Sequence, residues 1–479
     1  MELLIIPLLF CVAIALAPAN LSRILALGGG IGTLVVAWVH TLQFKADKVV
    51  SIFAPEWVSS FGLTFKMGYD GMSLFMVLLT SLVIPLILLA TFQLPYAKNK
   101  GFNAMVMLMQ FGLLGVFMAQ DGILFYVFWE LTLIPVFLIA YWYGDEDRKP
   151  VLTKFFIYTF VGSLAMLLSF IALGLQASDF SYEQLVAVGL NPKVAFWVMG
   201  GFFLAFAIKI PLIPFHTWQP STYTSAPTAG TMLLSALMLK MALYGMVKWM
   251  IPLAPEALPD YQCIVIVLGL IGIVYAAIIA IQEKDIKRLF AYASISHVGL
   301  IAAGIILFNK EVLSAAFLQM ANHSLVAVGL FLAASILEER FKTRKLEEMG
   351  GVAKLSPTFA FWFAVLCFAS VSVPFTSGFI GEFLLLKGLY QYHWVVGLIA
   401  GTTLVFGAVY MLRAYQVSMF GSPNKESFED LRWNELLVFI VLSVLIVTLG
   451  IFPQFINDFV GPSLKNVMDS MQTSQPILP

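Results

Sequence analysis

The stretch "AFAIKIPLIPFHTW", residues 205–218, places a lysine and two prolines inside a run that is otherwise apolar. A proline has no N–H and interrupts a helix, and a charge at the middle of a bilayer costs about 2.5–3.5 kcal/mol. Lys209, Pro211 and Pro214 therefore all work against a simple membrane-spanning helix. We interpret the stretch as one end of a pathway for a charged species.

Composition supports a membrane setting for this stretch. Of the 479 residues 60% are hydrophobic and 11% are charged, and the mean hydropathy is +0.92, whereas soluble domains carry about 25% charged residues. The chain is thus expected to be an integral membrane protein. The 27 basic and 27 acidic residues balance, so nothing indicates a nucleic-acid partner. Three isolated cysteines, Cys11, Cys263 and Cys367, predict neither a disulfide nor a metal site.

Apolar runs near the ~20 residues needed to cross a bilayer predict an all-α membrane protein with about fourteen spans. They lie at roughly 2–20, 22–43, 69–93, 102–119, 121–143, 151–175, 194–218, 227–251, 262–282, 286–308, 311–338, 357–388, 393–420 and 433–459. We expect one polytopic domain over residues 1–479. Its parts are N-terminal helices in 1–93, a first repeat in 102–251, a second in 262–420, and a last helix with a short tail in 433–479.

Two of these spans carry helix breakers at matching places. The seventh contains Pro211 and Pro214, and the twelfth contains Pro374 followed by Gly378 and Gly381. Paired interrupted helices are typical of transporters built from inverted repeats, so spans 4–8 and 9–13 are predicted to form two five-helix units of inverted topology. The alternative is that both are simple packing kinks.

Charge between the spans predicts the orientation. Assigned to alternate sides of this map, 17 of the 27 Lys and Arg residues fall on one side, 8 on the other and two within spans. The positive-inside rule then places both termini on the non-cytoplasmic side. The charged segment 338–351 is the longest inner connection and is expected to form a helix at the interface.

Four ionisable residues are predicted deep within spans: Glu130, Lys209, Lys240 and Glu382. Such residues usually face a cavity and pair with one another. Burial disfavours the charged form of a lysine and a nearby carboxylate favours it, so a changed spacing between Glu130 and Lys209 would shift a proton. The alternative is a static ion pair between these two that locks their helices together.

Two histidines extend this set. His297 in "SISHVGLIAAG" and His323 in "ANHSLVAVGLF" are flanked by small and hydroxyl-bearing residues that leave room for water. Because histidine titrates near neutral pH, both are candidate proton relays. The alternative is that each is a hydrogen-bonded core residue.

Five ordered motifs carry a family resemblance: "FWELTLIPVFLIAYWYG" (128–144), "KIPLIPFHTW" (209–218), "SAPTAGTMLLSALMLK" (225–240), "EKDIKRLFAYASISHVG" (283–299) and "GFIGEFLLLKG" (378–388). Together with the fourteen-span layout they resemble the antiporter-like, proton-translocating membrane subunits of respiratory NADH-quinone oxidoreductase, complex I. A glutamate at position 382 and a short tail are closest to the chain M type within that family.

The resemblance implies a role for each buried charge. Glu130 and Lys209 would be the coupled pair of a first half-channel, Lys240 the central relay and Glu382 the gate of a second, with His297 and His323 on the hydrated axis. One segment departs from the family. After "HTW" the family usually has Leu-Pro-Asp-Ala-His, whereas residues 219–223 are Gln-Pro-Ser-Thr-Tyr.

The resemblance also implies cofactors and partners. This chain would hold no cofactor or metal, and NADH, flavin, iron–sulfur clusters and quinone are expected in other subunits. The expected partners are the L- and N-type membrane subunits and the lipid bilayer of the cell inner membrane, with an organellar membrane as the alternative. Two further functions stay open: a subunit of a sodium/proton antiporter or membrane-bound hydrogenase, and a scaffold that does not pump.

Overall fold

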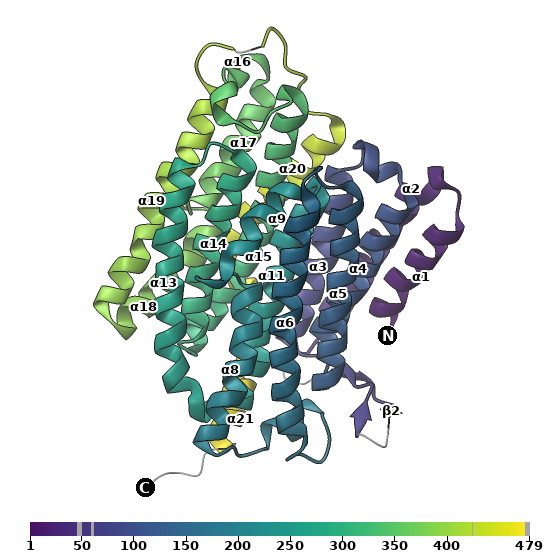
Figure 1. Ribbon diagram of the computed structural model, residues 1–479, viewed down its shortest axis with the longest axis vertical. Helices are drawn as coiled ribbons and strands as arrows, with labels where there is room; N and C mark the ends of the chain where they lie inside the picture. Colours follow the sequence, from purple (N-terminus) through teal and green to yellow (C-terminus); the bar gives the residue numbers. More distant parts are fainter. Residues whose placement is uncertain (46–49, 59–61, 424, 475–479) are drawn as a thin grey trace.

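A computed structural model describes residues 1–45, 50–58, 62–423 and 425–474. The helices form one elongated bundle with most axes running along its length (Figure 1). Within the described residues, twelve helical segments are long and apolar enough to cross a membrane, and two shorter apolar helices accompany them. The chain is therefore an all-α, multi-pass membrane protein, as predicted; the number fourteen and the repeat relationship stay predictions.

The first half of the bundle follows the predicted spans closely. Its helices are α1 (Glu2–Leu16), α2 (Ser22–Gln43), α3 (Gly71–Ala90), α4 (Lys100–Met118), α5 (Gly122–Tyr143), α6 (Arg148–Gly174) and α8 (Pro192–Lys209). The eighth predicted span is continuous over 228–253. It comprises α10 (Thr228–Leu233), the π segment η5 (Leu234–Met238), α11 (Leu239–Gly245), the π segment η6 (Met246–Met250) and α12 (Ile251–Leu253).

The second half continues in the same manner. Its helices are α13 (Leu258–Gln282), α14 (Ile286–Ile305), α15 (Lys310–Phe341), α17 (Pro357–Ser370), α18 (Ser377–Tyr392), α19 (Trp394–Met419) and α20 (Trp433–Ile451). Several helices begin at a side chain that accepts backbone N–H groups. Asp70 caps α3, Asn99 caps α4, Asp121 caps α5, Asp285 caps α14 and Asn309 caps α15.

Both predicted helix breaks are present. Helix α8 ends at Lys209, and the chain re-forms a helix only at η4 (Phe215–Trp218) and α9 (Gln219–Ser225). Helix α17 ends at Ser370 and α18 begins at Ser377. At each break a backbone N–H donates to the carbonyl five residues earlier in the chain. The Leu212 N–H donates to the Ala207 carbonyl at 2.8 Å, and the Val373 N–H donates to the Phe368 carbonyl at 3.1 Å. The first of these bonds provides a donor for the Ala207 carbonyl, because Pro211, four residues later, has no N–H to donate.

Three segments differ from the sequence prediction. The predicted last span, 433–459, is too long: α20 ends at Ile451, and a separate helix, α21 (Gln454–Ser474), packs on α3 and α15. The charged segment 338–351 is not an interface helix, because α15 runs to Phe341 and only the short η8 (Leu346–Glu348) follows. Residues 50–69 include strands, with β1 (Val50–Phe53) paired to β4 (Met67–Tyr69) and β2 (Glu56–Val58) to β3 (Leu63–Thr64).

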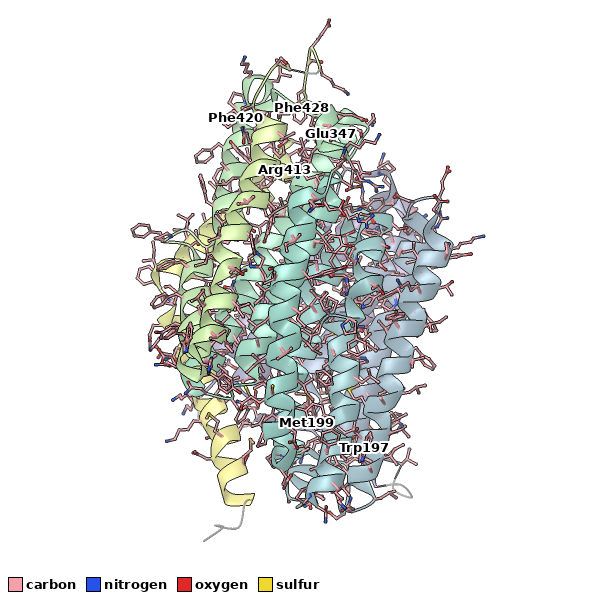
Figure 2. All side chains as sticks on the ribbon, turned by 60° about the vertical axis from the view of Figure 1, so that its left-hand side comes forward. Trp197, Met199, Glu347, Arg413, Phe420 and Phe428 are labelled. Atoms are coloured by element: carbon pink, nitrogen blue, oxygen red, sulfur yellow. The ribbon has the colours of Figure 1, made fainter. Side chains whose placement is uncertain are left out.

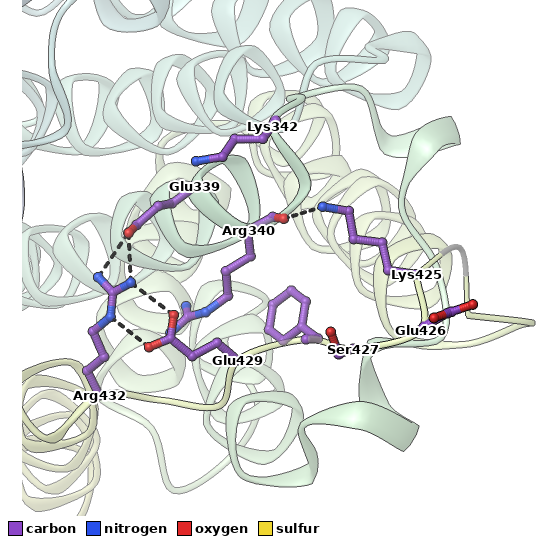
Figure 3. A pocket seen from close by; sticks show the side chains of 9 residues that line it. Glu339, Arg340, Lys342, Lys425, Glu426, Ser427, Glu429 and Arg432 are labelled. Atoms are coloured by element: carbon purple, nitrogen blue, oxygen red, sulfur yellow. Dashed lines mark hydrogen bonds and ion pairs between the residues drawn. The ribbon is translucent and has the colours of Figure 1, made fainter.

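The two ends of the bundle are chemically different. Glu347 and Arg413 lie at one end, which we term the charged end, and Trp197 and Met199 lie towards the other (Figure 2). The second end carries the β-strands and α21 (Figure 1), and we term it the strand end. The charged end holds an open pocket of about 600 Å³ (Figure 3). There Arg432 pairs with Glu339 at 2.8 Å and with Glu429 at 3.0 Å, so the pocket is a network of ion pairs.

Candidate proton-transfer site

Lys240 and His323 form the centre of the site. Lys240 on α11 is fully buried, and its ammonium nitrogen lies 2.6 Å from His323 Nδ1 on α15 and 2.8 Å from the Ser235 carbonyl oxygen. An ammonium group only donates hydrogen bonds, so with a charged Lys240 the Nδ1 atom must be the acceptor. The proton of the neutral imidazole is then on Nε2, which lies 2.9 Å from the Ser294 hydroxyl. The pair can thus pass a proton from lysine to imidazole.

His297 and Glu382 form the second pair. His297 Nδ1 on α14 lies 3.2 Å from Glu382 Oε1 on α18, and the Glu382 side chain is 2% exposed. The other ring nitrogen, Nε2, is 3.3 Å from the Tyr410 hydroxyl on α19. A proton reaching His297 therefore has a carboxylate within hydrogen-bond distance.

A small cavity with a mainly apolar wall and a few polar groups lies between the two pairs. The ring centroids of His297 and His323 are 6.5 Å apart, which is too far for a direct hydrogen bond. Both rings line a cavity of about 30 Å³ together with Ser235, Ser294 and Ser370. A water needs about 10–15 Å³ and two or more polar partners. The Ser235 hydroxyl has no protein partner, so the cavity offers a water both room and hydrogen bonds.

Glu130 and Lys209 lie near each other without forming an ion pair. Lys209, at the last turn of α8, is 2% exposed, and its ammonium nitrogen is 5.4 Å from the ring centroid of Trp129. Glu130 follows Trp129 on α5 and is partly exposed. Both residues belong to the described chain, and no contact within 4.0 Å joins their charged atoms. The static ion pair considered above is absent from this conformation.

One charged pair was missed from the sequence. Lys248 is not among the ionisable residues predicted deep within spans, but it is 1% exposed and its ammonium nitrogen lies 2.8 Å from Asp70 Oδ2. The nitrogen is also 4.2 Å from the ring centroid of Tyr182. One signal was available: Lys248 follows Lys240 by eight residues, which places both on similar sides of a helix. Its partner, 178 positions away, had no such signal.

These features define a class. A multi-pass helical bundle whose interior is lined by lysine, histidine and glutamate side chains within hydrogen-bond distance is built to move protons or small cations. Known proteins narrow the class further. The family model described as NADH:quinone oxidoreductase/Mrp antiporter, TM, matches residues 119–407. The chain belongs to this family, which confirms the resemblance drawn from the motifs.

Relatives agree along nearly the whole chain. NADH-quinone oxidoreductase subunit M of Rickettsia typhi is 34% identical over 446 residues, which cover 91% of this chain and 90% of that protein. A chain of respiratory complex I from Thermus thermophilus superposes with a TM-score of 0.90 at 32% identity, covering 98% of this chain and 99% of that one. A chain of the Mrp complex from Dietzia sp. DQ12-45-1b has a TM-score of 0.88 at 19% identity, covering 99% of both, and shares the fold.

Proposed function

We propose that this chain is the M-type, proton-translocating membrane subunit of an NADH-quinone oxidoreductase. The observation that carries the proposal is the buried series Lys240, His323, His297 and Glu382, in which each neighbouring pair is either within 3.2 Å or separated by a cavity that fits a water. The assignment to this respiratory complex is supported by the names of relatives that are 31–36% identical to this chain.

The proposed transfer runs from α8 to α18. When Glu130 moves away from Lys209, the loss of its negative charge lets the buried ammonium release a proton towards Lys240. Lys240 passes a proton to His323 Nδ1, and His323 gives up its Nε2 proton towards Ser294 and the cavity. A water there delivers a proton to His297, and Glu382 receives it in turn. After this transfer His323 carries its proton on Nδ1, so it must return to the Nε2 tautomer by proton exchange with the cavity water before Lys240, recharged from Lys209, can pass on the next proton.

The surrounding complex would supply the driving force. NADH, flavin, iron–sulfur clusters and quinone belong to other subunits in this proposal, and the present chain contributes no redox centre. Its neighbours would be the L- and N-type membrane subunits. We place the chain in the cell inner membrane with both termini on the non-cytoplasmic side.

The test uses the assembled complex in sealed vesicles. We expect Lys209→Ala to lower the proton-to-electron ratio, because the first half-channel loses its only buried cation on α8. Lys193→Ala serves as the matched control, since Lys193 is an exposed lysine at the start of the same helix. The ratio is measured from NADH-driven acidification. A Lys209→Ala complex that assembles and keeps the original ratio would contradict the proposal.

A gradient-driven antiporter subunit is the second candidate, because the Mrp complex chain shares the fold. The two functions differ in what accompanies the chain. Flavin and iron–sulfur absorbance in the purified complex would support the respiratory assignment and exclude a plain antiporter. Hydrogen-evolving activity in the same preparation would point instead to a membrane-bound hydrogenase.

A further inference from the structure

A second polar cluster lies between Lys240 and the strand end of the bundle, outside the series above. It consists of Asp70, Ser73, Tyr182, Tyr244 and Lys248. Asp70 and Lys248 form the buried ion pair at 2.8 Å. The Ser73 N–H donates to Asp70 Oδ1 at 2.8 Å, and the Ser73 hydroxyl lies 2.8 Å from the Tyr244 hydroxyl. Ser73 thus joins the ion pair to Tyr244.

The cluster is aligned with Lys240. Tyr244 lies four residues after Lys240, and Lys248 lies eight residues after Lys240. The three side chains therefore lie along one side of the same span over about 12 Å of helix axis. The π segments η5 and η6 flank this stretch, and η6 contains Lys248. Segments of π-helix occur frequently at functional sites. The irregular backbone of η6 therefore coincides with Lys248, and Tyr244 lies in α11 between the two π segments.

Stability alone does not account for the ion pair. Desolvation of two charges usually offsets their attraction, so a buried pair stabilises a fold no better than well-packed apolar residues. Beyond the pair, Tyr182 lies against Lys248, and its neighbour Glu183 is 57% exposed at the side chain and pairs with Lys66 at 2.6 Å. Tyr182 and Glu183 are consecutive residues of α7 (Tyr182–Val186), so the cluster lies within one short helix of a solvated surface.

We propose that Lys240 is a branch point and that the Asp70–Lys248 cluster releases its proton at the strand end. This inference rests on the proposed function. A proton leaving the Lys240 ammonium crosses to the Tyr244 hydroxyl through a bridging water, because the hydrogen bonds of the ammonium are made to Ser235 and His323. Tyr244 passes its own proton to Ser73, and the Ser73 proton neutralises the Asp70 carboxylate. Lys248, which is 1% exposed, then lacks a counter-charge and gives one proton to a water that enters from the strand end. The Asp70 proton crosses to Lys248 and restores the pair, so one proton enters and one leaves.

The decisive variant is Lys248→Arg in the assembled complex. Arginine keeps the positive charge and the donors for Asp70 but is not deprotonated in proteins. A structural ion pair would tolerate it, whereas a relay would stop. We expect the Lys248→Arg complex to assemble, to oxidise NADH with an artificial electron acceptor at the original rate, and to show a lowered proton-to-electron ratio.

Two further variants guard against a folding defect. Tyr244→Phe keeps the ring and removes only the hydroxyl, and the double change Asp70→Asn with Lys248→Gln keeps a neutral hydrogen-bonded pair; both are expected to lower the ratio as well. The control is Arg340→Gln with Glu435→Gln, an ion pair of equal 2.8 Å length whose side chains are 5% exposed, located at the charged end. It should leave the ratio unchanged.

The outcomes separate the two proposals. If Lys209→Ala lowers the ratio while Lys248→Arg and Tyr244→Phe leave it unchanged, release occurs through Glu382 and the branch is overturned. If Lys209→Ala itself has no effect, the proposed function fails and the branch fails with it. A reduced ratio in Lys209→Ala, Lys248→Arg and Tyr244→Phe supports both.

Discussion

At the scale of single residues, the short contact between Lys240 and His323 limits how protons are distributed. Two cationic groups 2.6 Å apart would repel strongly in a buried site. The pair therefore holds at most one positive charge, and a second proton can enter only as the first leaves. Such exclusive occupancy gives transfer along the series a direction once one end is supplied.

His297 is the residue whose loss separates a relay from a core histidine. We expect His297→Gln to lower coupled proton pumping about tenfold or more, since general acid–base groups typically contribute at least that much and glutamine cannot exchange a proton. The amide can still accept or donate one hydrogen bond to Glu382, so packing should survive. Pumping is followed by a pH-sensitive dye in vesicles.

The matched control for this prediction is His216→Gln. His216 is also buried, but its ring packs against Tyr275 and its Nδ1 atom has no protein partner. The His216→Gln complex should therefore pump protons at the normal rate. Equal activity of the His297→Gln and unmodified complexes would identify His297 as a structural residue.

At the scale of elements, close packing of α13 on α14 holds His297 in place. A Cβ atom on Gly269 would lie 2.8 Å from the Gly299 carbonyl oxygen, and Gly299 is two residues beyond His297. The obstructing atom belongs to the backbone and cannot rotate away. The two helices can approach this closely only with glycine at the crossing.

Gly269→Ala should therefore push the helices apart. Overpacking of this kind costs about 1–3 kcal/mol, and we expect a lower unfolding temperature together with reduced pumping, as the shift of α14 lengthens the contact between His297 and Glu382. Gly272→Ala is the control, because its Cβ would meet only Ile213 at 3.8 Å. Both variants are compared by thermal unfolding of the purified complex. Identical unfolding temperatures of the Gly269→Ala and Gly272→Ala complexes would show that α13 and α14 accommodate the added methyl group without loss of stability.

The elements also show why prediction from sequence succeeded in part. The apolar spans were predictable because the bilayer fixes their length, and the breaks at Lys209 and Ser370 because proline removes a backbone donor. Helix α21 was not predictable, since residues 454–474 mix polar and apolar side chains and the first turns of the helix look like a continuation of the preceding span. Its position depends on tertiary contact, such as the Gly71 N–H donating to the Ser463 hydroxyl at 2.8 Å.

The same limit applies within the site. The sequence placed Glu130, Lys209, Lys240, Glu382, His297 and His323 in the interior through the rarity of ionisable residues in spans. It could not tell which would touch: His323 meets Lys240, and His297 meets Glu382. The residues of these two contacts are 83 and 85 positions apart in the sequence. Whether they meet depends on the rotation of each helix about its axis, which composition does not fix.

At the scale of the whole molecule, the difference between the two ends predicts how the protein sits in its membrane. The exposed ion pairs of Lys284 with Glu347 and of Lys345 with Glu348 lie in the segments assigned to the cytoplasm. Lys248, one of the eight cations assigned to the other side, is buried and neutralised by Asp70. Removing it from the count strengthens the asymmetry on which the positive-inside rule depends.

Single cysteines would test this orientation directly. In a chain whose Cys11, Cys263 and Cys367 are replaced by serine, we expect Lys193→Cys to react with a membrane-impermeant maleimide in right-side-out vesicles only. Lys345→Cys, whose native side chain is 68% exposed, should react in inside-out vesicles only. The cysteine-free chain is the control and should stay unlabelled in both. The reverse pattern would place the charged end outside, and the Asp70–Lys248 cluster would then face the side from which protons are taken up.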